Sequence, residues 1–521
     1  MAKDKFLRGA LILTVAGLMV KVIGSVNRIL LSRMLGGEGI GLYQMAYPVY
    51  LLMLSVSSAG VPIAVSILVA EKVARNDFAG ARRLFKVTLV LMAVFGVLFA
   101  GTLLGLSNLL LTTGVIRDTR AALALYVLTP AVFFSSILAS FRGYFQGYQM
   151  MTPPAVSQVL EQLVRVMTMV LLAYFLLPYG LEYAAAGAAF GAIPGALTGL
   201  VVLSWFYHRA NRDWQQKIAE QPDFPLDKVA SIAKRLVLLA LPVSCANIMV
   251  PITSSIDMLL VPNCLAVAGF SVAEATTLFG YLSGMAQPLI MMATIPTMSI
   301  AASLVPAVSE AFVLHHLDEI ETKSLTALKI GLLLTMPAAT GMWVLAAPIS
   351  KALYGTWQAA PVIAGVAPSI VFLGVFQVTT GALQGMGKTA TPMWNMVIGA
   401  VVKVWVLYVL TSRPDLNILG AAWASNLNFA LAAGLNLFFL RRGGLSFDFG
   451  GFLKICFASL ILGGAAYLIY GVAADLGGTA AGLAISIIMG GVVYILAVGG
   501  LGILSAAEKS KLPFIGKFFH P

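Results

Sequence analysis

The sequence has few charged residues. Lys, Arg, Asp and Glu make up only 10% of its 521 residues, against about 25% in an average soluble protein. Hydrophobic residues make up 60% of the chain, and the mean hydropathy is +0.93. This composition excludes a water-soluble globular protein and predicts an all-α polytopic membrane protein.

Cysteine, histidine and catalytic motifs are also scarce. The three cysteines and four histidines show no metal-ligand spacing and no disulfide framework. Nucleotide-binding loops, serine-hydrolase elbows, zinc-protease motifs and paired outer-loop carboxylates are missing from the sequence. We therefore expect a protein that is not an enzyme, with no catalytic residue, no cofactor and no metal site.

Long apolar runs predict about fourteen transmembrane helices, each long enough to cross a bilayer of ~30 Å. Their expected limits are 7–35, 42–70, 86–111, 121–145, 155–177, 184–207, 235–261, 278–305, 326–349, 360–384, 393–411, 418–440, 453–472 and 481–504. The basic start of the chain is interpreted as the beginning of a retained first span, because its apolar stretch continues without a small-residue cleavage site.

The basic residues predict the orientation of these spans. With a cytoplasmic N-terminus, 24 of the 33 Lys and Arg residues fall in inner segments and four in outer loops. Positive charge is retained on the cytoplasmic side of membranes. We therefore expect a multi-pass protein of the bacterial cytoplasmic (inner) membrane with both termini cytoplasmic, and we interpret the net charge of +12 as orientation rather than nucleic-acid binding.

An internal repeat predicts two related halves. Residues 143–166 align with residues 381–404, with Arg165 opposite Lys403 and a shared Gln-Gly pair followed by a proline. Six spans per half would give both halves the same orientation. The expected domains are an N-terminal six-helix lobe (1–207), a cytoplasmic linker (208–234), a C-terminal six-helix lobe (235–440) and an added helix pair with a cytoplasmic tail (441–521).

Within the expected interiors of the predicted spans, basic residues outnumber acidic residues. The basic residues are Lys21, Arg28, Arg33, Arg165 and Lys403, and the acids are Glu161 and Asp257. A cation near the bilayer centre costs at least ~2.5–3.5 kcal/mol, so such residues usually face a protein interior or a wet cavity. The excess of positive charge predicts a cavity that binds an anion.

Each candidate also has a structural interpretation. Lys21 and Arg28 could pair with acids or reach the membrane surface. Glu161 and Arg165 are spaced to form an intrahelical ion pair, which would leave Arg165 less able to bind an anion. Asp257 could be a proton or sodium site, or a partner for one of the cations.

Specific motifs in the N-terminal part carry a family resemblance. Residues 21–36, K-V-I-G-S-V-N-R-I-L-L-S-R-M-L-G, resemble the first helix of the MurJ-type lipid II flippases. Residues 37–48 and 59–71 look closer still to the stage V sporulation protein B group. Both groups belong to the polysaccharide-transporter branch of the multidrug/oligosaccharidyl-lipid/polysaccharide (MOP) exporter superfamily.

The resemblance implies a fold and a site. The fold would be two six-helix lobes in a V around a cationic cavity, with two added helices that line a groove for a lipid tail. Lys21 and Arg33 fall where the MurJ-type family has basic residues. Asn27 falls where it has an arginine and Arg28 where it has an aspartate, and the arginine on its second helix has no match in residues 47–53.

The sequence therefore predicts an alternating-access flippase for an undecaprenyl-pyrophosphate-linked sugar, such as lipid II or a related cell-wall, spore-cortex or polysaccharide precursor. Its partners would be this substrate, membrane lipid and an unidentified coupling ion (Na⁺, H⁺ or Cl⁻), with no nucleic acid, and the protein would be a monomer. The expected pyrophosphate site comprises Lys21, Asn27, Arg28, Arg165 and Lys403, with Asp257 or Glu161 as coupling groups or charge partners.

Three alternatives stay open at this point. A cation-coupled multidrug exporter of the same superfamily would have acids in its cavity. A membrane glycosyltransferase or polymerase would have a large outer loop with catalytic carboxylates. The third alternative is a sporulation factor whose depletion phenotype is indirect.

Overall fold

Helices form throughout the part of the chain that the computed structural model describes, which comprises residues 2–222, 224–225, 227–442, 444 and 449–503. No strand occurs among these residues. The prediction of an all-α fold is confirmed, and it has a simple cause. A helix satisfies its own backbone hydrogen bonds, which lipid cannot do.

Contacts within the chain group it into two compact units. The first unit comprises Met1–Ala266 and Phe270–Gly280, and the second comprises Val267–Gly269 and Tyr281–Pro521. The helices of the first unit are α1 (Ala2–Ser58), α2 (Val61–Ala74), α3 (Phe78–Thr112), η1 (Thr119–Ala121), α4 (Ala122–Gly147), α5 (Thr152–Leu176), η2 (Leu177–Tyr179), α6 (Leu181–Phe190), α7 (Ala192–Glu220), α8 (Val229–Asn247), α9 (Met249–Val267) and α10 (Val272–Gly280).

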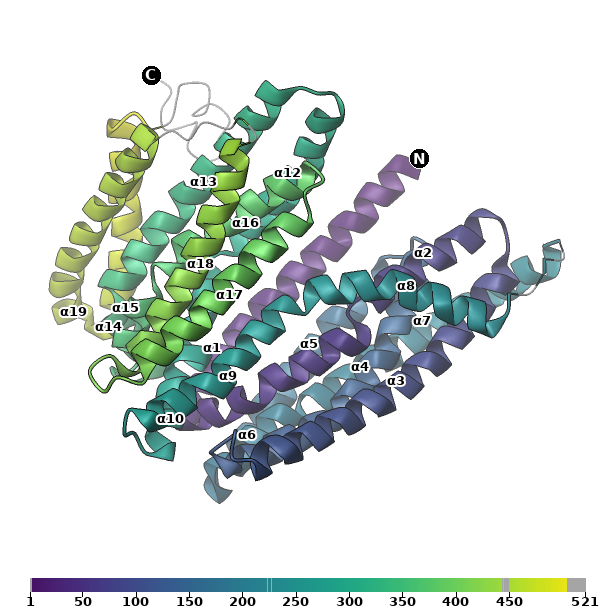
Figure 1. The fold of residues 1–521 in the computed structure, drawn as a ribbon, viewed down its shortest axis with the longest axis horizontal. Helices are drawn as coiled ribbons and strands as arrows, with labels where there is room; N and C mark the ends of the chain where they lie inside the picture. The colour runs from purple at the N-terminus through teal and green to yellow at the C-terminus, as the bar shows by residue number, and fades with distance from the viewer. Residues whose placement is uncertain (1, 223, 226, 443, 445–448, 504–521) are drawn as a thin grey trace. The chain divides into compact units, whose positions relative to one another are not determined.

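The second unit continues the chain with a further set of helices (Figure 1). They are η3 (Tyr281–Ala286), α11 (Gln287–Ala293), α12 (Ile295–Val313), α13 (Leu317–Val344), α14 (Ala346–Tyr354), α15 (Ala360–Val366), α16 (Ser369–Gly385), α17 (Ala390–Thr411), α18 (Asn417–Arg442) and α19 (Phe449–Gly500). The predicted tail beyond residue 503 lies outside the described residues.

Twelve segments of the described residues are long and apolar enough to cross a membrane. The first of them, Val15–Ala74, covers the first two predicted spans. Its helix α1 bends at Gly36, whose φ of 67° is a conformation that glycine adopts easily. The expected number of fourteen is thus not reproduced as fourteen separate helices.

Two predicted spans are broken in the structure. The span expected at 235–261 is divided between α8 and α9, which meet at Ile248. The span expected at 278–305 is divided into η3, α11 and α12. Pro288 and Pro296 lie in the first turns of α11 and α12. Proline is well tolerated at a helix start and disruptive further in, so these two residues favour new helices over one continuous helix.

Helices α8, α9 up to Ala266, and α10 group with the first unit in this structure. A side chain at Gly60 would meet the Ala240 carbonyl oxygen, and one at Gly41 would meet the Thr276 carbonyl oxygen. These close backbone approaches join the start of α2 to α8, and α1 to α10. In addition, α7 continues to Glu220, into the predicted linker. The division into lobes at residues 207 and 235 stays a prediction.

The glycines of the sequence repeat make equivalent contacts in the two units. In the first unit Gly143 and Gly147 of α4 lie against α2, where an added Cβ would be 2.7 Å from the Pro62 carbonyl oxygen and 2.5 Å from the Val69 Cβ, respectively. In the second unit Gly381 and Gly385 of α16 lie in the same way against α12. Small residues four apart let two membrane helices approach closely, so the repeat encodes the same helix contact twice.

Candidate functional site

The cations of the first unit are positioned by the contact between α1 and α5. Gly24 of α1 leaves room for the Gln162 side chain, which a Cβ would meet at 3.3 Å. One turn further, the Asn27 amide nitrogen donates to the Met169 sulfur at 3.3 Å. Asn27 is only 4% exposed, and its side-chain oxygen has no hydrogen-bond partner among the described residues. These contacts fix the side of α1 from which Arg28 projects.

Arg28 lies beside a row of tyrosines on the second arm of α1. Its guanidinium carbon is 6.0 Å from the centre of the Tyr47 ring. Tyr47 stacks on Tyr43 with ring centres 5.3 Å apart and lies 5.8 Å from Tyr50 on the other side. A guanidinium at this distance is attracted to the face of an aromatic ring. The tyrosine row therefore supports Arg28 without neutralising it.

Arg165 of α5 faces the same tyrosine row. Its guanidinium lies near enough to Tyr50, Tyr47 and Tyr43 for an ionised phenol at any of these positions to interact with it electrostatically. Residues Arg28 and Arg165, which the sequence could only place on separate helices, thus approach one row of aromatic residues from two elements of the first unit.

A cavity of about 320 Å³ adjoins Arg165 inside the first unit. It is lined by Leu54, Ser55, Ser58, Ala59, Pro62, Ser135, Leu138, Ala139, Arg142, Glu161 and Arg165. Three serine hydroxyls and three charged side chains face a space large enough for several water molecules or a small anion. The cavity is therefore polar although helices of an apolar unit surround it.

Two arginines share one carboxylate in this cavity. The Arg142 Nη2 atom lies 2.5 Å from Glu161 Oε2, and the Arg165 Nη2 atom lies 2.5 Å from Glu161 Oε1. The side chains of Arg142, Glu161 and Arg165 are 19%, 12% and 18% exposed. Both Nε atoms are buried and have no hydrogen-bond partner among the described residues. The three side chains carry one net positive charge and retain donors for a further anionic group.

Sequence reasoning missed Arg142. It was counted as a residue of an inner loop, because it falls near the end of an apolar run. In the structure it lies on α4, five residues before that helix ends, and reaches Glu161 across the α4–α5 connection. The sequence did carry a signal, because Arg142 is a lone arginine inside the predicted span 121–145.

The other predicted site residues lie elsewhere. Lys21 is exposed on α1, Asp257 is buried on α9, and Lys403 is buried on α17 of the second unit. Each of these three takes part in polar or electrostatic interactions with other residues. The structure therefore brings together Asn27, Arg28, Glu161 and Arg165, and the joint site that includes Lys21 and Lys403 stays a prediction.

A second cavity, of about 680 Å³, lies in the second unit. Its walls come from α11, α13, α14, α16 and both arms of α19, with Leu345, Leu462, Ala466, Leu483 and Ile487 among the lining residues. The two arms of α19 meet at Gly478, where φ is 77°. The predicted C-terminal helix pair is thus present, and it lines a largely apolar space.

A third group of charged residues joins α1, η1 and α10 within the first unit. Arg120 donates to both carboxylate oxygens of Asp118 at 2.9 and 2.8 Å and pairs with Glu38 of α1 at 2.8 Å. The hydroxyl of Thr276 of α10 also donates to Asp118, at 2.8 Å. Burial raises the pKa of Asp118, but the hydrogen bonds from Arg120 and Thr276 outweigh it and hold that pKa below its ordinary value.

Comparison with known protein families identifies the chain. A family described as "Polysaccharide biosynthesis protein" matches residues 6–312, and the MatE family matches residues 242–409. Stage V sporulation protein B of Bacillus subtilis (strain 168) is 30% identical over 429 residues, which cover 81% of each chain. The chain belongs to the polysaccharide biosynthesis protein family. The lipid II flippase MurJ of the same organism is 26% identical over 77% of this chain and 76% of the relative.

Solved structures agree on the fold of this family member. An inward-facing multidrug resistance MATE transporter of the MOP superfamily superposes with a TM-score of 0.67 at 16% identity, covering 82% of this chain and 94% of that one. The lipid II flippase MurJ in an inward closed conformation superposes with a TM-score of 0.62 at 16% identity, covering 94% and 98%. With its apolar helices, the protein is a multi-pass membrane protein with the MOP fold, and its sequence relatives include a lipid II flippase.

Proposed function

We propose that this protein is a flippase that translocates an undecaprenyl-pyrophosphate-linked sugar, lipid II or a related precursor, across the bacterial cytoplasmic membrane. The observation that carries the proposal is the buried positive charge of the first unit, where Arg142 and Arg165 share Glu161 and Arg28 lies on the adjoining tyrosine row. An uncompensated guanidinium in an apolar unit favours an anionic ligand.

The chemistry of this group suits a pyrophosphate. The planar guanidinium of arginine presents paired donors that match phosphate oxygens. Asn27 adds a buried amide beside Arg28, and the serines of the cavity add hydroxyls. In the sequence resemblance, residues 47–53 lack the arginine that MurJ-type flippases carry there. Here Arg165 faces Tyr47 and Tyr50 of that stretch, so positive charge reaches it from another helix.

The apolar cavity beside α19 suits the lipid tail. Its walls combine both arms of α19 with α13 and α14, and its lining is almost entirely hydrocarbon. An isoprenoid chain would gain the usual free energy of burial there, about 25 cal/mol per Å² of apolar surface. The sugar-pyrophosphate head and the prenyl tail would then be handled by different parts of one chain.

A buried cationic site also offers an energy source. One elementary charge that crosses the membrane potential changes its energy by about 2.3 kcal/mol per 100 mV. We therefore propose that the membrane potential biases the conformational change of the protein. We also propose that the protein works as a monomer. Na⁺, H⁺ or Cl⁻ would be the candidate coupling ions, with Asp257 or Glu161 as the groups that respond.

A cation-coupled multidrug exporter is the second candidate function. The match of residues 242–409 to the MatE family and the buried Asp257 on α9 support it. The charge of the first-unit cavity argues against it, because an organic cation would meet a net positive site.

The test is transport in vesicles that contain the purified protein and a fluorescent lipid-linked precursor. Flipping is measured as the fraction of label that becomes accessible to a membrane-impermeant reductant. We expect Arg28→Ala and Lys21→Ala to slow flipping about tenfold each, the effect of losing one hydrogen bond to a charged group. Arg28→Lys should flip the precursor at less than half of the wild-type rate, because lysine keeps the positive charge but lacks the paired donors of the guanidinium.

Lys86→Ala is the matched control, since Lys86 is exposed on α3 and does not line the cavity. It should flip the precursor at the wild-type rate. Unchanged flipping in both alanine variants would remove the site assignment. Failure of the wild-type protein to flip any lipid-linked precursor, together with drug efflux driven by a sodium or proton gradient, would favour the multidrug exporter.

A further inference from the structure

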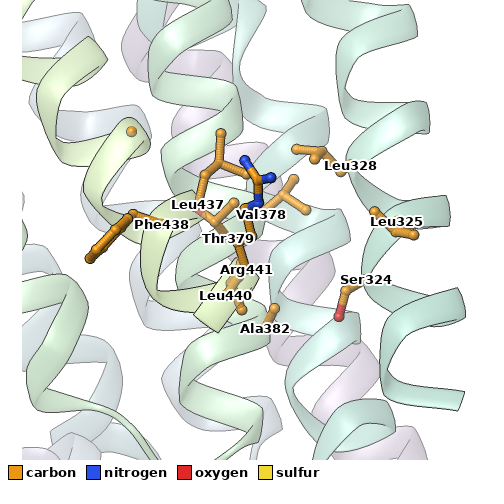
Figure 2. Close-up of a pocket in the computed structure, with 11 residues that line it drawn as sticks. Ser324, Leu325, Leu328, Val378, Thr379, Ala382, Leu437, Phe438, Leu440 and Arg441 are labelled. Atoms are coloured by element: carbon orange, nitrogen blue, oxygen red, sulfur yellow. The ribbon is translucent and has the colours of Figure 1, made fainter. Parts of the chain in front are cut away.

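A separate cavity of about 320 Å³ lies in the second unit, among α13, α16 and α18. Figure 2 shows the side chains that line it, with Leu325 and Leu328 from α13, Val378 from α16 and Leu437 from α18. Its volume is within the ~300–1,000 Å³ range of ligand pockets. Among the residues that line the two cavities of this unit, none is shared with the larger one beside α19. The prenyl-tail proposal therefore leaves this cavity unused.

The cavity lies at one end of its helices. Ser324 is in the second turn of α13, Ala382 is three residues from the end of α16, and Arg441 is in the last turn of α18. In a membrane-spanning bundle the ends of helices meet the headgroup region, and the residues one to two turns inside meet the first methylenes of the lipid chains. The cavity spans this boundary.

Its apolar walls are combined with two polar groups that lack partners. Ser324 is only 4% exposed, and its hydroxyl oxygen is buried with no hydrogen-bond partner in the described part of the chain. Arg441 lines the same cavity, and Figure 2 shows its side chain among the apolar residues. No described carboxylate forms an ion pair with it. The buried Ser324 hydroxyl without a partner favours an oxygen ligand. Arg441 is exposed at the edge of the cavity, where its guanidinium can donate to an anionic oxygen.

The neighbouring arginine provides a contrast. Arg442 has its guanidinium carbon 4.6 Å from the centre of the Phe438 ring, so it is held by a cation–π contact. It does not line the cavity, whereas Arg441 does. Two adjacent arginines of the same charge thus have different surroundings. Comparing their variants therefore distinguishes a specific effect of the cavity from a general effect of positive charge.

We propose that this cavity binds one anionic phospholipid of the surrounding bilayer. The phosphate would lie on Arg441 and the Ser324 hydroxyl, and the first part of one acyl chain would lie against Leu328, Val378 and Leu437. A zwitterionic phospholipid would bind less well, because its ammonium group would approach Arg441. The bound lipid would join α13 to α18 at their membrane-interface ends.

The experiment measures lipid binding to the full-length protein after delipidation in detergent. Phosphatidylglycerol or phosphatidylcholine is added, and the bound lipids are counted by native mass spectrometry. Wild type should bind phosphatidylglycerol in preference to phosphatidylcholine. Arg441→Gln should weaken phosphatidylglycerol binding about tenfold, as expected for the loss of one hydrogen bond to a charged group. Arg442→Gln should bind as wild type.

Two further variants test the cavity itself. Leu328→Trp fills it and should abolish the preferential binding. Ser324→Ala removes the hydroxyl with little change in volume and should weaken phosphatidylglycerol binding, so it tests the cavity even where the tryptophan variant fails to fold. Equal binding by wild type, Arg441→Gln and Ser324→Ala would overturn the proposal. The proposal would also be overturned if undecaprenyl pyrophosphate at equal concentration displaced phosphatidylglycerol from wild type but not from Arg441→Gln. That result would assign the cavity to the prenyl lipid instead.

Discussion

Glu161 balances the buried charge of the first unit, because its two oxygens are divided between Arg142 and Arg165. The pair with Arg165 could be predicted from the sequence, since the residues are four apart on one helix. The pair with Arg142 could not. It joins residues 19 apart on different helices, and it depends on how α4 turns into α5. Sequence spacing reports contacts within an element, whereas contacts between elements depend on packing.

Replacing Glu161 should be costly for this reason. Glu161→Gln leaves two buried guanidinium groups without a carboxylate, which should lower the free energy of unfolding by about 3–5 kcal/mol. The measurement is thermal or denaturant unfolding in detergent. The double variant Glu161→Gln/Arg142→Gln should recover part of the loss, because it removes one of the unpaired charges.

Glu310→Gln provides the comparison, since Glu310 is exposed on α12. It should change stability by less than about 0.5 kcal/mol. Wild-type stability in Glu161→Gln would mean that water or an ion already neutralises the arginines.

Asp118 should make stability depend on pH. Its pKa is held below the ordinary value of about 3.9 by Arg120 and Thr276. A carboxyl group with a lowered folded-state pKa stabilises the protein fully above its unfolded pKa, and this contribution is lost as the pH falls through the folded pKa. Wild type should therefore unfold at a higher temperature than Asp118→Asn at pH 7, and the difference should shrink steadily below about pH 4.

Asp415→Asn is the control, because Asp415 is exposed between α17 and α18. It should follow the wild-type unfolding temperature across the same pH range. A constant difference between wild type and Asp118→Asn from pH 7 to pH 3 would show that the carboxylate charge is not what stabilises the contact.

At the scale of helices, the sequence repeat predicted two related halves but not the helix contacts that its glycines make. Matching glycines at 143 and 381 indicated related halves, and the structure shows why glycine is needed at both positions. A Cβ would lie 2.7 Å from the Pro62 carbonyl oxygen at Gly143, and 2.7 Å from the Ala301 carbonyl oxygen at Gly381. The obstacle is backbone in each case, so it cannot turn away as a side chain could.

Gly143→Ala and Gly381→Ala should each destabilise the protein by about 1–3 kcal/mol, the usual cost of overpacking. The comparison is Gly101→Ala on α3 and Gly464→Ala on α19, where an added Cβ meets no atom within 4 Å. Those two changes should be neutral or slightly stabilising, because alanine favours a helix over glycine by about 0.5–1 kcal/mol. Unfolding in detergent measures all four, and equal stability of the two sets would contradict the close contact.

Helix breaks were less predictable than helix contacts. Apolar length identified most of the membrane segments, because hydropathy reports burial in lipid directly. It could not show that residues 15–74 cover two expected spans, or that η3, α11 and α12 divide another. Proline and glycine favour such breaks, but the packing of neighbouring helices decides which of them are used.

At the scale of the whole molecule, the division into halves and the orientation are different kinds of prediction. The repeat suggested a boundary near residue 207, yet α8, α9 up to Ala266, and α10 group with the first unit here. The repeat records how the halves are related in sequence, whereas the contacts record where each helix packs. Orientation depends on neither, because the distribution of lysine and arginine decides it during insertion.

Orientation can be tested with single cysteines on the two sides. Asp415 lies in an expected outer loop and Gln215 in the expected cytoplasmic part of α7, and both are exposed. Cys264 is buried and Cys456 half-buried. All three native cysteines, Cys245 included, are replaced by alanine to give a background without thiols. In intact cells a membrane-impermeant maleimide should label Asp415→Cys fully and Gln215→Cys only after the membrane is permeabilised. The reverse pattern would show that the protein is inserted in the opposite orientation. That orientation would contradict the one predicted from the 24-to-4 distribution of lysine and arginine, on which the direction of the proposed flipping depends.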